Sequence, residues 1–320
     1  MSTSTPTLGL IADIGGTNAR FALCESGGEV RDTLVLPCAD YPGLAEAADA
    51  YLSRVGPGSR PSVGAFAVAS PVTSDQVSMT NHHWLFSIDA TRRTLGLKRL
   101  RVVNDFVAVA HCVPRLSDQH RVPIGRGEPM AGAPVAILGP GTGLGVALLV
   151  PSETGWRAIP TEGGHVTLAA ADDEESAVLG VLRRRFGHVS AERVLSGPGL
   201  VNLRSALATL AGLEAPPLDP AQVTESALAR SDSLSVRALD MFLAMLGTTA
   251  GNLALSSGAM GGVHIAGGIL PRMIDTLRAS AFRPRFEEKG RFRDYLGRIP
   301  TYLITHPYPA FPGLSGLLED

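Results

Sequence analysis

The stretch that decides the fold is Leu8-Gly-Leu-Ile-Ala-Asp-Ile-Gly-Gly-Thr-Asn-Ala-Arg-Phe-Ala-Leu-Cys24. Residues 8–12 form an apolar run typical of a buried strand, residues 13–18 form a glycine turn, and residues 19–24 form a second apolar run. A helix after the turn would indicate a dinucleotide-binding unit, but the second run shows no helical pattern. The stretch therefore predicts a β-hairpin.

The same pattern returns later in the chain. Residues 134–138 predict a strand, residues 139–145 (Gly-Pro-Gly-Thr-Gly-Leu-Gly) a turn, and residues 146–150 another strand. Two similar hairpins in 320 residues favour an α/β fold of about two domains. Apolar runs also predict strands at 63–70, 100–103 and 262–266. Helical periodicity predicts helices at 42–55, 106–113, 174–186, 190–194, 199–213, 220–229 and 235–257.

Charge and cysteine content exclude several classes of protein. A formal net charge of −2 gives no field that would attract nucleic acid or an anionic membrane. The three cysteines form no C-x-x-C pair, so we expect reduced thiols rather than a disulfide framework or a zinc knuckle. The N-terminus is polar, and the apolar run after it is too short to span a bilayer. We therefore expect a cytoplasmic protein without a signal peptide or membrane anchor.

Two glycine turns could hold phosphate groups. In the first, Asp13-Ile-Gly-Gly-Thr17, main-chain N–H groups are open to phosphate oxygens because glycine has no side chain, and Asp13 could hold hydrated Mg²⁺. In the second, Gly141, Thr142 and Gly143 offer the same groups. The alternative is a plain hairpin turn, with Asp13 as its capping residue. No Gly-Lys-Ser/Thr sequence follows either turn, so neither is a Walker P-loop.

A third glycine pair, Gly267-Gly268, ends the predicted strand at 262–266. A flat adenine or its ribose could lie against a backbone without side chains. The alternative is a strand-to-helix turn.

Asn104-Asp105 ends the predicted strand at 100–103, where ligand sites of α/β sheets form. Asp105 could take a proton from a sugar hydroxyl as a general base, and Asn104 could hold a neighbouring hydroxyl. The alternative for Asp105 is the N-cap of the helix that begins at Phe106.

Further polar residues could bind a sugar. Glu162 and His165 flank two glycines, and Glu192 lies near a helix start. A carboxylate can accept hydrogen bonds from two vicinal hydroxyls, and a neutral imidazole can donate or accept. The alternatives are a surface loop for Glu162 and His165 and a helix cap for Glu192. A metal-ligand role for His165 lacks a second His or Cys at suitable spacing.

Two other clusters have simpler interpretations. Lys98, Arg99 and Arg101 are interpreted as a solvated face. For His82-His83, a role in a substrate loop or in packing is favoured over metal binding.

In combination, these motifs resemble the bacterial glucokinase family of the hexokinase group over nearly the whole chain. The resemblance is carried by Ala12-Asp-Ile-Gly-Gly-Thr-Asn-Ala-Arg20, Met79-Thr-Asn-His82, Val103-Asn-Asp-Phe106, Gly141-Thr-Gly-Leu-Gly145, Glu162-Gly-Gly-His-Val166, Gly187-His-Val-Ser-Ala-Glu-Arg-Val-Leu-Ser-Gly-Pro-Gly-Leu200 and Ile265-Ala-Gly-Gly-Ile269.

The resemblance implies an actin-like ATPase (ribonuclease H-like) fold with a cleft between two domains, residues 1–115 with 306–320 and residues 116–305. It implies a homodimeric enzyme of glycolysis that phosphorylates glucose at its 6-hydroxyl with ATP, with Asp105 as the base, and the Mg²⁺ that ATP needs is the ion expected above at Asp13. The implied glucose contacts are Asn104, Asp105, Glu162, His165 and Glu192. The expected nucleotide contacts, from the resemblance and the three turns, are Ala12, Asp13, Ile14, Gly15, Gly16, Thr17, Gly141, Thr142, Gly143, Gly267 and Gly268, with Asp13 reaching Mg²⁺ through water.

Three departures from this family pattern stand out. The zinc-binding cysteine cluster of the related repressor–kinase sugar kinases is missing, which places the chain outside that branch. The tail at 311–320 looks short, and Pro140 removes one N–H from the second turn. The alternatives to a glucokinase are a kinase for another hexose or one using polyphosphate, a sugar-sensing regulator, and a chaperone-like ATPase. For a DNA-binding regulator we expect no room for a helix-turn-helix before the first strand.

Overall fold

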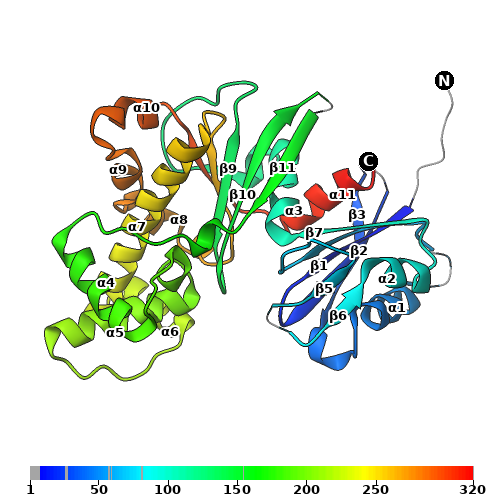
Figure 1. Cartoon of the computed structure of the whole chain (residues 1–320), viewed down its shortest axis with the longest axis horizontal. Helices are drawn as coiled ribbons and strands as arrows, with labels where there is room; N and C mark the ends of the chain where they lie inside the picture. Colours follow the sequence, from blue (N-terminus) through cyan, green and yellow to red (C-terminus); the bar gives the residue numbers. More distant parts are fainter. Residues whose placement is uncertain are drawn as a thin grey trace. The chain divides into compact units, whose positions relative to one another are not determined.

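The computed structural model describes residues 8–25, 28–56, 58, 60–80, 82–153 and 155–319. Contacts between residues divide the chain into two compact units, Met1–Ser117 with His306–Asp320 (unit 1) and Asp118–Thr305 (unit 2). Figure 1 gives the labels of their helices and strands. The N-terminal segment 1–7, residues 57 and 59 of a predicted loop, and Asn81 lie outside the described residues.

Unit 1 is built on a five-stranded sheet in the order β3-β2-β1-β4-β7. β2 pairs antiparallel with both β1 and β3, whereas β4 runs parallel to β1 and β7. The hairpin predicted for residues 8–24 is confirmed, because Ile14 faces Ala19 across the turn. The strands are Leu8–Ile14 (β1), Asn18–Glu25 (β2), Val30–Pro37 (β3), Val63–Val68 (β4) and Arg99–Asn104 (β7).

Both faces of this sheet are covered. Phe21 and the buried Tyr51 and Trp84 belong to the core on one face, and Ile11 and Phe311 belong to the core on the other. Because both faces are buried, β1 and β4 are continuous apolar runs rather than alternating ones. The first face carries α1 (Leu44–Val55), β5 (Gln76–Ser78), β6 (Leu85–Ser87) and α2 (Ile88–Thr94), and the second carries α3 (Asp105–Cys112) and α11 (Ala310–Leu317).

The C-terminal helix α11 lies beside α3 (Figure 1). The two backbones approach so closely that any side chain at Gly313 would collide with the carbonyl of Ala108. Arg99 donates a hydrogen bond to the carbonyl of Leu318, at the end of α11. The interpretation of Arg99 as part of a solvated cluster is therefore wrong, because its guanidinium caps a helix.

Unit 2 is built on a six-stranded sheet in the order β11-β10-β9-β12-β13-β8. The first five strands in this order, β11-β10-β9-β12-β13, pair like the strands β3-β2-β1-β4-β7 of unit 1. In both sheets two antiparallel pairs are followed by two parallel pairs. The predicted second hairpin is therefore confirmed as β9–β10. The strands are Arg121–Pro123 (β8), Val135–Pro140 (β9), Leu144–Ser152 (β10), Gly155–Thr161 (β11), Val263–Ile265 (β12) and Thr301–Ile304 (β13).

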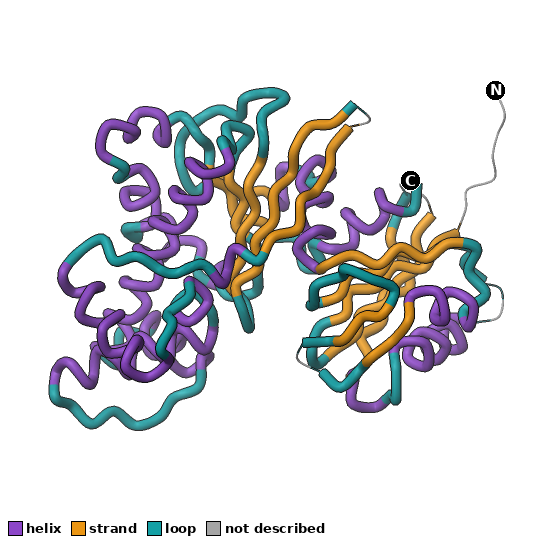
Figure 2. Tube along the Cα trace, viewed as in Figure 1, coloured by secondary structure: helices purple, strands orange, loops and turns teal. Residues whose placement is uncertain are grey.

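The helices of unit 2 pack together beside this sheet (Figure 2). The prediction of a helix at 190–194 is correct only as a single 3-10 turn, η5 (Ala191–Arg193). The α-helices are Asp173–Phe186 (α4), Gly197–Ala211 (α5), Pro220–Leu228 (α6), Ser233–Ser257 (α7), Ile274–Ala279 (α8), Phe282–Glu287 (α9) and Arg293–Gly297 (α10). The 3-10 turns of the chain are Cys38–Asp40 (η1), Val113–Arg115 (η2), Asp118–His120 (η3), Gly163–His165 (η4), η5, Leu270–Arg272 (η6) and Gly290–Phe292 (η7).

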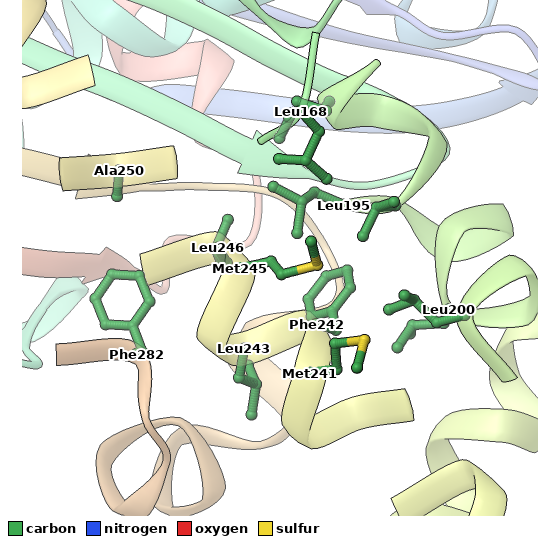
Figure 3. Packing of buried hydrophobic residues seen from close by; sticks show 14 of the residues in the cluster. Leu168, Leu195, Leu200, Met241, Phe242, Leu243, Met245, Leu246, Ala250 and Phe282 are labelled. Carbon is green, nitrogen blue, oxygen red and sulfur yellow. The ribbon is translucent and has the colours of Figure 1, made fainter. Parts of the chain in front are cut away.

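The long helix α7 is the centre of the larger core. Figure 3 shows Phe242, Met245 and Leu246 of α7 packed near Leu195 and Leu200 from other segments. By length and composition α7 could cross a membrane, and within the described residues it alone could. However, 67% of its apolar window is buried inside the unit, as in the core helix of a globular protein.

The three cysteines, Cys24, Cys38 and Cys112, are buried free thiols, which confirms the expectation that they form no disulfide.

Candidate active site

The first glycine turn joins β1 to β2. The N–H of Gly15 donates to the carbonyl of Asn18 at 3.0 Å and closes the turn. The side chains of Ala12 and Ile14 are fully buried in the core, whereas residues 15–17 are half-buried or exposed. Any contact of Ala12 or Ile14 with a nucleotide would therefore be through the main chain, and the accessible part of the turn is residues 15–17.

Asp13 lies directly opposite Arg20 in the β1–β2 hairpin. Arg20 Nη1 is 3.3 Å from Asp13 Oδ2, and both side chains are partly exposed. Burial raises the pKa of the Asp13 carboxyl, and the positive charge of Arg20 opposes this rise. Sequence reasoning missed Arg20 as a partner, although a tight hairpin turn brings these two positions together.

Asn104, not Asp105, is the N-cap of α3. The side chain of Asn104 accepts a hydrogen bond from the N–H of Phe106 at 2.9 Å. Asp105 is the first residue of the helix, and its Oδ1 accepts from the same N–H at 2.9 Å. The N-cap position that was the alternative role for Asp105 is therefore taken by Asn104. Asp105 uses only Oδ1 for the N–H of Phe106, and its Oδ2 takes no part in this cap.

The Asp105 carboxyl has the ionisation expected of a base that works at neutral pH. Burial, and then the negative charge of Asp13, raise the pKa of Asp105 to about 7, against hydrogen bonds that lower it. A carboxyl group with a pKa near 7 can accept a proton at neutral pH and is only half ionised beforehand. Asp13, on β1, and Asp105, at the start of α3, therefore interact electrostatically.

The second glycine turn, between β9 and β10, is occupied on one side by Glu192. Glu192 Oε2 accepts a hydrogen bond from the N–H of Leu144 at 2.9 Å, and a side chain at Gly143 would collide with this carboxylate. A side chain at Gly141 would meet no atom within 4 Å. The candidate sugar-binding carboxylate of Glu192 therefore lies against Gly143 and Leu144, whereas the backbone at Gly141 has free space beside it.

Pro140 is the last residue of β9 and pairs with Leu144. The N–H that proline lacks is therefore missing from the end of a strand and not from the turn itself.

Glu162 directly precedes the 3-10 turn η4, and His165 is the last residue of that turn. Glu162 Oε2 lies 3.9 Å from His165 Nε2, and the two side chains are 63% and 60% exposed. The N–H of Ala191 donates to the carbonyl of Val166 at 2.9 Å, which brings this turn beside the segment that carries Glu192. The three predicted sugar-binding residues of unit 2 therefore lie in one region, on two adjoining turns.

The third glycine turn packs against the end of β9. Gly267 has a φ of +89°, and a side chain there would collide with the carbonyl of Pro140. A side chain at Gly268 would meet no atom within 4 Å. Gly267 is thus required by the fold, and Gly268 leaves an open backbone surface beside the second turn.

Metal-binding residues are sparse in this region. Among the described residues, no group of three or more His, Cys, Asp and Glu lies close enough to hold a metal ion. Mg²⁺ is commonly held by one or two carboxylates together with water and substrate phosphates. Asp13, beside the first turn and within electrostatic reach of Asp105, fits that kind of site. The rings of His82 and His83 are tilted by 35° with centroids 4.2 Å apart, and His82 also meets Trp84 edge to face, so His82 takes part in packing while His83 is exposed.

Comparisons with known proteins show the family of the chain. The family model described as Glucokinase matches residues 10–320. The chain is similar to a glucokinase of Paramagnetospirillum magneticum, with 56% identity over 97% of each chain. It is also similar to the crystal structure of a glucokinase from an Antarctic psychrotroph, with a TM-score of 0.89 and 38% identity over 98% of this chain and 99% of that one.

A more distant structure shares the fold alone. It is a ROK family glucokinase from Streptomyces griseus in complex with glucose and AMPPNP, with a TM-score of 0.65 and 17% identity over 98% of this chain and 99% of that one. Together, the two solved structures assign the chain to the actin-like ATPase fold that the sequence predicted.

Proposed function

The chain belongs to the glucokinase family, whose members are ATP:glucose 6-phosphotransferases, and on this premise we propose how it transfers the γ-phosphoryl group of ATP to the 6-hydroxyl of glucose. The observation that carries the proposal is the Asp105 carboxyl. It lies at the junction of β7 and α3, it has a pKa of about 7, and Asn104 caps the helix beside it.

Asp105 is the general base of the proposed reaction. The 6-hydroxyl oxygen attacks the γ-phosphorus, the bond from that phosphorus to the oxygen of the leaving ADP breaks, and the hydroxyl proton moves to the Asp105 carboxylate. Phosphoryl transfer of this kind depends mainly on positioning and on charge stabilisation. A positioned base contributes about 10²–10⁴ in rate.

The sugar is held by Asn104, Glu162, His165 and Glu192. Glu192 uses one carboxylate oxygen for the N–H of Leu144, so its other oxygen remains to accept from a sugar hydroxyl. The exposed tips of Glu162 and His165 can together accept from and donate to neighbouring hydroxyls. The hydrogen bond from Leu144 supports this assignment, because it fixes the position of the Glu192 carboxylate.

The nucleotide is held by the glycine turns. Main-chain N–H groups of residues 15–17 and 141–143 bind the phosphates, and Gly267-Gly268 accommodates the adenosine. Mg²⁺, when bound at Asp13 through water, supplies charge neutralisation to the phosphates. The Streptomyces griseus protein was solved with glucose and AMPPNP, and we extend those two ligand classes to this chain.

We further propose a cytoplasmic homodimer that binds neither nucleic acid nor membranes. The formal net charge of −2 and the burial of α7 within its own unit support the latter two points.

A coupled assay for the sugar phosphate tests the proposal across sugars and phosphoryl donors. Glucose with ATP should give the highest kcat/KM. Preference for fructose, mannose or polyphosphate would contradict the substrate assignment. Glucose binding by calorimetry without turnover with any donor would instead indicate a sugar-sensing protein.

A further inference from the structure

Ser70 is the centre of a small hydrogen-bonded network in unit 1. It lies just beyond the end of β4 and is 2% exposed. Its hydroxyl donates to the carbonyl of Ala69 at 2.7 Å and accepts from the N–H of Thr80 at 2.7 Å, and Thr80 Oγ1 lies 3.0 Å away. A hydroxyl has one proton, and that of Ser70 is used by Ala69. The Thr80 hydroxyl must therefore donate to Ser70. The N–H and the O–H of Thr80 thus both donate to the hydroxyl oxygen of Ser70.

The same residue also contacts Asn104. The carbonyl of Ser70 accepts from Asn104 Nδ2 at 3.4 Å, and Asn104 Oδ1 accepts from the N–H of Phe106 at 2.9 Å. The orientation of an amide is assigned from its partners, and here a backbone donor requires the oxygen at the helix end. The amide nitrogen consequently faces Ser70 with one N–H, and the Asn104 side chain also hydrogen-bonds to the Asp105 carboxyl.

We propose that Ser70 and Thr80 are positioning residues that hold the Asn104 amide as a hydrogen-bond donor to the sugar. This inference rests on the proposed function, in which Asn104 binds a hydroxyl next to the one that reacts. Asn104 then offers the sugar the N–H that Ser70 does not hold, in exchange for its contact with Asp105, while its oxygen stays at the helix end. A hydroxyl that accepts from Asn104 keeps its own proton for a carboxylate, so the network selects a sugar with a hydroxyl in that place.

The proposal predicts a selective change in glucose affinity. Ser70→Ala removes the three hydroxyl contacts and frees the segment that supplies the carbonyl, so the KM for glucose should rise about tenfold, as for the loss of a hydrogen bond. The KM for ATP should stay within about twofold. Ser315→Ala is the matched control, since Ser315 is also buried in unit 1 and accepts from Cys24. It should change neither KM.

A double-mutant cycle separates positioning from general destabilisation. Asn104→Ser keeps a good N-cap residue and removes the amide donor. In that background Ser70→Ala should add less than about a twofold further rise in the KM for glucose. Fully additive effects, or an unchanged KM in Ser70→Ala, would overturn the inference.

Two further measurements keep the test decisive. If Ser70→Ala does not fold, Thr80→Val serves in its place, because Thr80 is an exposed residue that would lose only its hydroxyl. Its KM for glucose should also rise, and an unchanged KM would overturn the inference. The dissociation constant of glucose, measured by calorimetry, should follow the same pattern. If wild type binds glucose but does not phosphorylate it, the proposed function fails, while the same cycle measured with the dissociation constant of glucose still decides the role of Ser70.

Discussion

Replacing Asp105 with Asn should make the protein more stable and nearly inactive. The pKa of Asp105 is raised from 3.8 to about 7. This difference corresponds to about 4 kcal/mol at 1.36 kcal/mol per pH unit. The folded protein therefore disfavours the ionised carboxylate, so its destabilising effect is complete above pH 7, shrinks as the pH falls through 7, and is absent below pH 3.8.

Asn is uncharged and can still accept from the N–H of Phe106, which Asp105 contacts at 2.9 Å. Partial exposure and water penetration reduce the effect, so we expect Asp105→Asn to gain about 1–4 kcal/mol of unfolding free energy at pH 8. The gain should be much smaller at pH 5. Turnover should fall by about 10²–10⁴ because no base remains.

Urea denaturation at pH 5 and pH 8, together with the coupled assay, provides the measurement. Asp89→Asn is the control, since Asp89 is an exposed acid in the first turn of α2 in the same unit. It should show no gain at pH 8 and normal turnover. A less stable Asp105→Asn protein at pH 8, or one with wild-type turnover, would refute the reasoning.

Three other predictions concern the remaining parts of the site. The kcat/KM for glucose should rise with pH and level off above about pH 7, because Asp105 must lose its proton to act as a base; a flat profile between pH 5.5 and 8 would contradict this. Glu192→Gln should raise the KM for glucose and leave that for ATP nearly unchanged, because its amide oxygen can still accept from Leu144, whereas Glu192→Ala should raise both. Gly267→Ala should lower the unfolding free energy by about 2 kcal/mol or more in thermal denaturation, because of its positive φ and the close carbonyl. Gly268→Ala, at an open position, should cost less than about 1 kcal/mol and raise the KM for ATP; equal losses for the two glycines would contradict the packing argument.

The hairpins and glycine turns could be predicted because apolar runs buried on both faces have a strong sequence signal. β11 had no such signal, since all of its residues are exposed or half-buried. β12 and β13 contain only three and four residues, too few for a periodic pattern. Their place in the sheet is set by pairing with distant strands, so only one of them was predicted.

The sequence predicted the individual residues of the candidate site, but it did not predict the hydrogen bonds and ion pairs between them. Sequence alone could not decide whether Asn104 or Asp105 would cap α3, since both types are good N-caps. Ser70 contacts residues ten and thirty-four positions away, and such contacts depend on tertiary structure. The contact between Arg20 and Asp13 was also missed, although the predicted hairpin already implied the register of these two residues.

A crystal structure of the protein with bound glucose tests the central claim most directly. The account predicts that the 6-hydroxyl oxygen lies about 2.6–3.2 Å from a carboxylate oxygen of Asp105, within reach of proton transfer. Glucose bound with this hydroxyl directed at another acid, and with both Asp105 oxygens engaged by the main chain of α3, would contradict it.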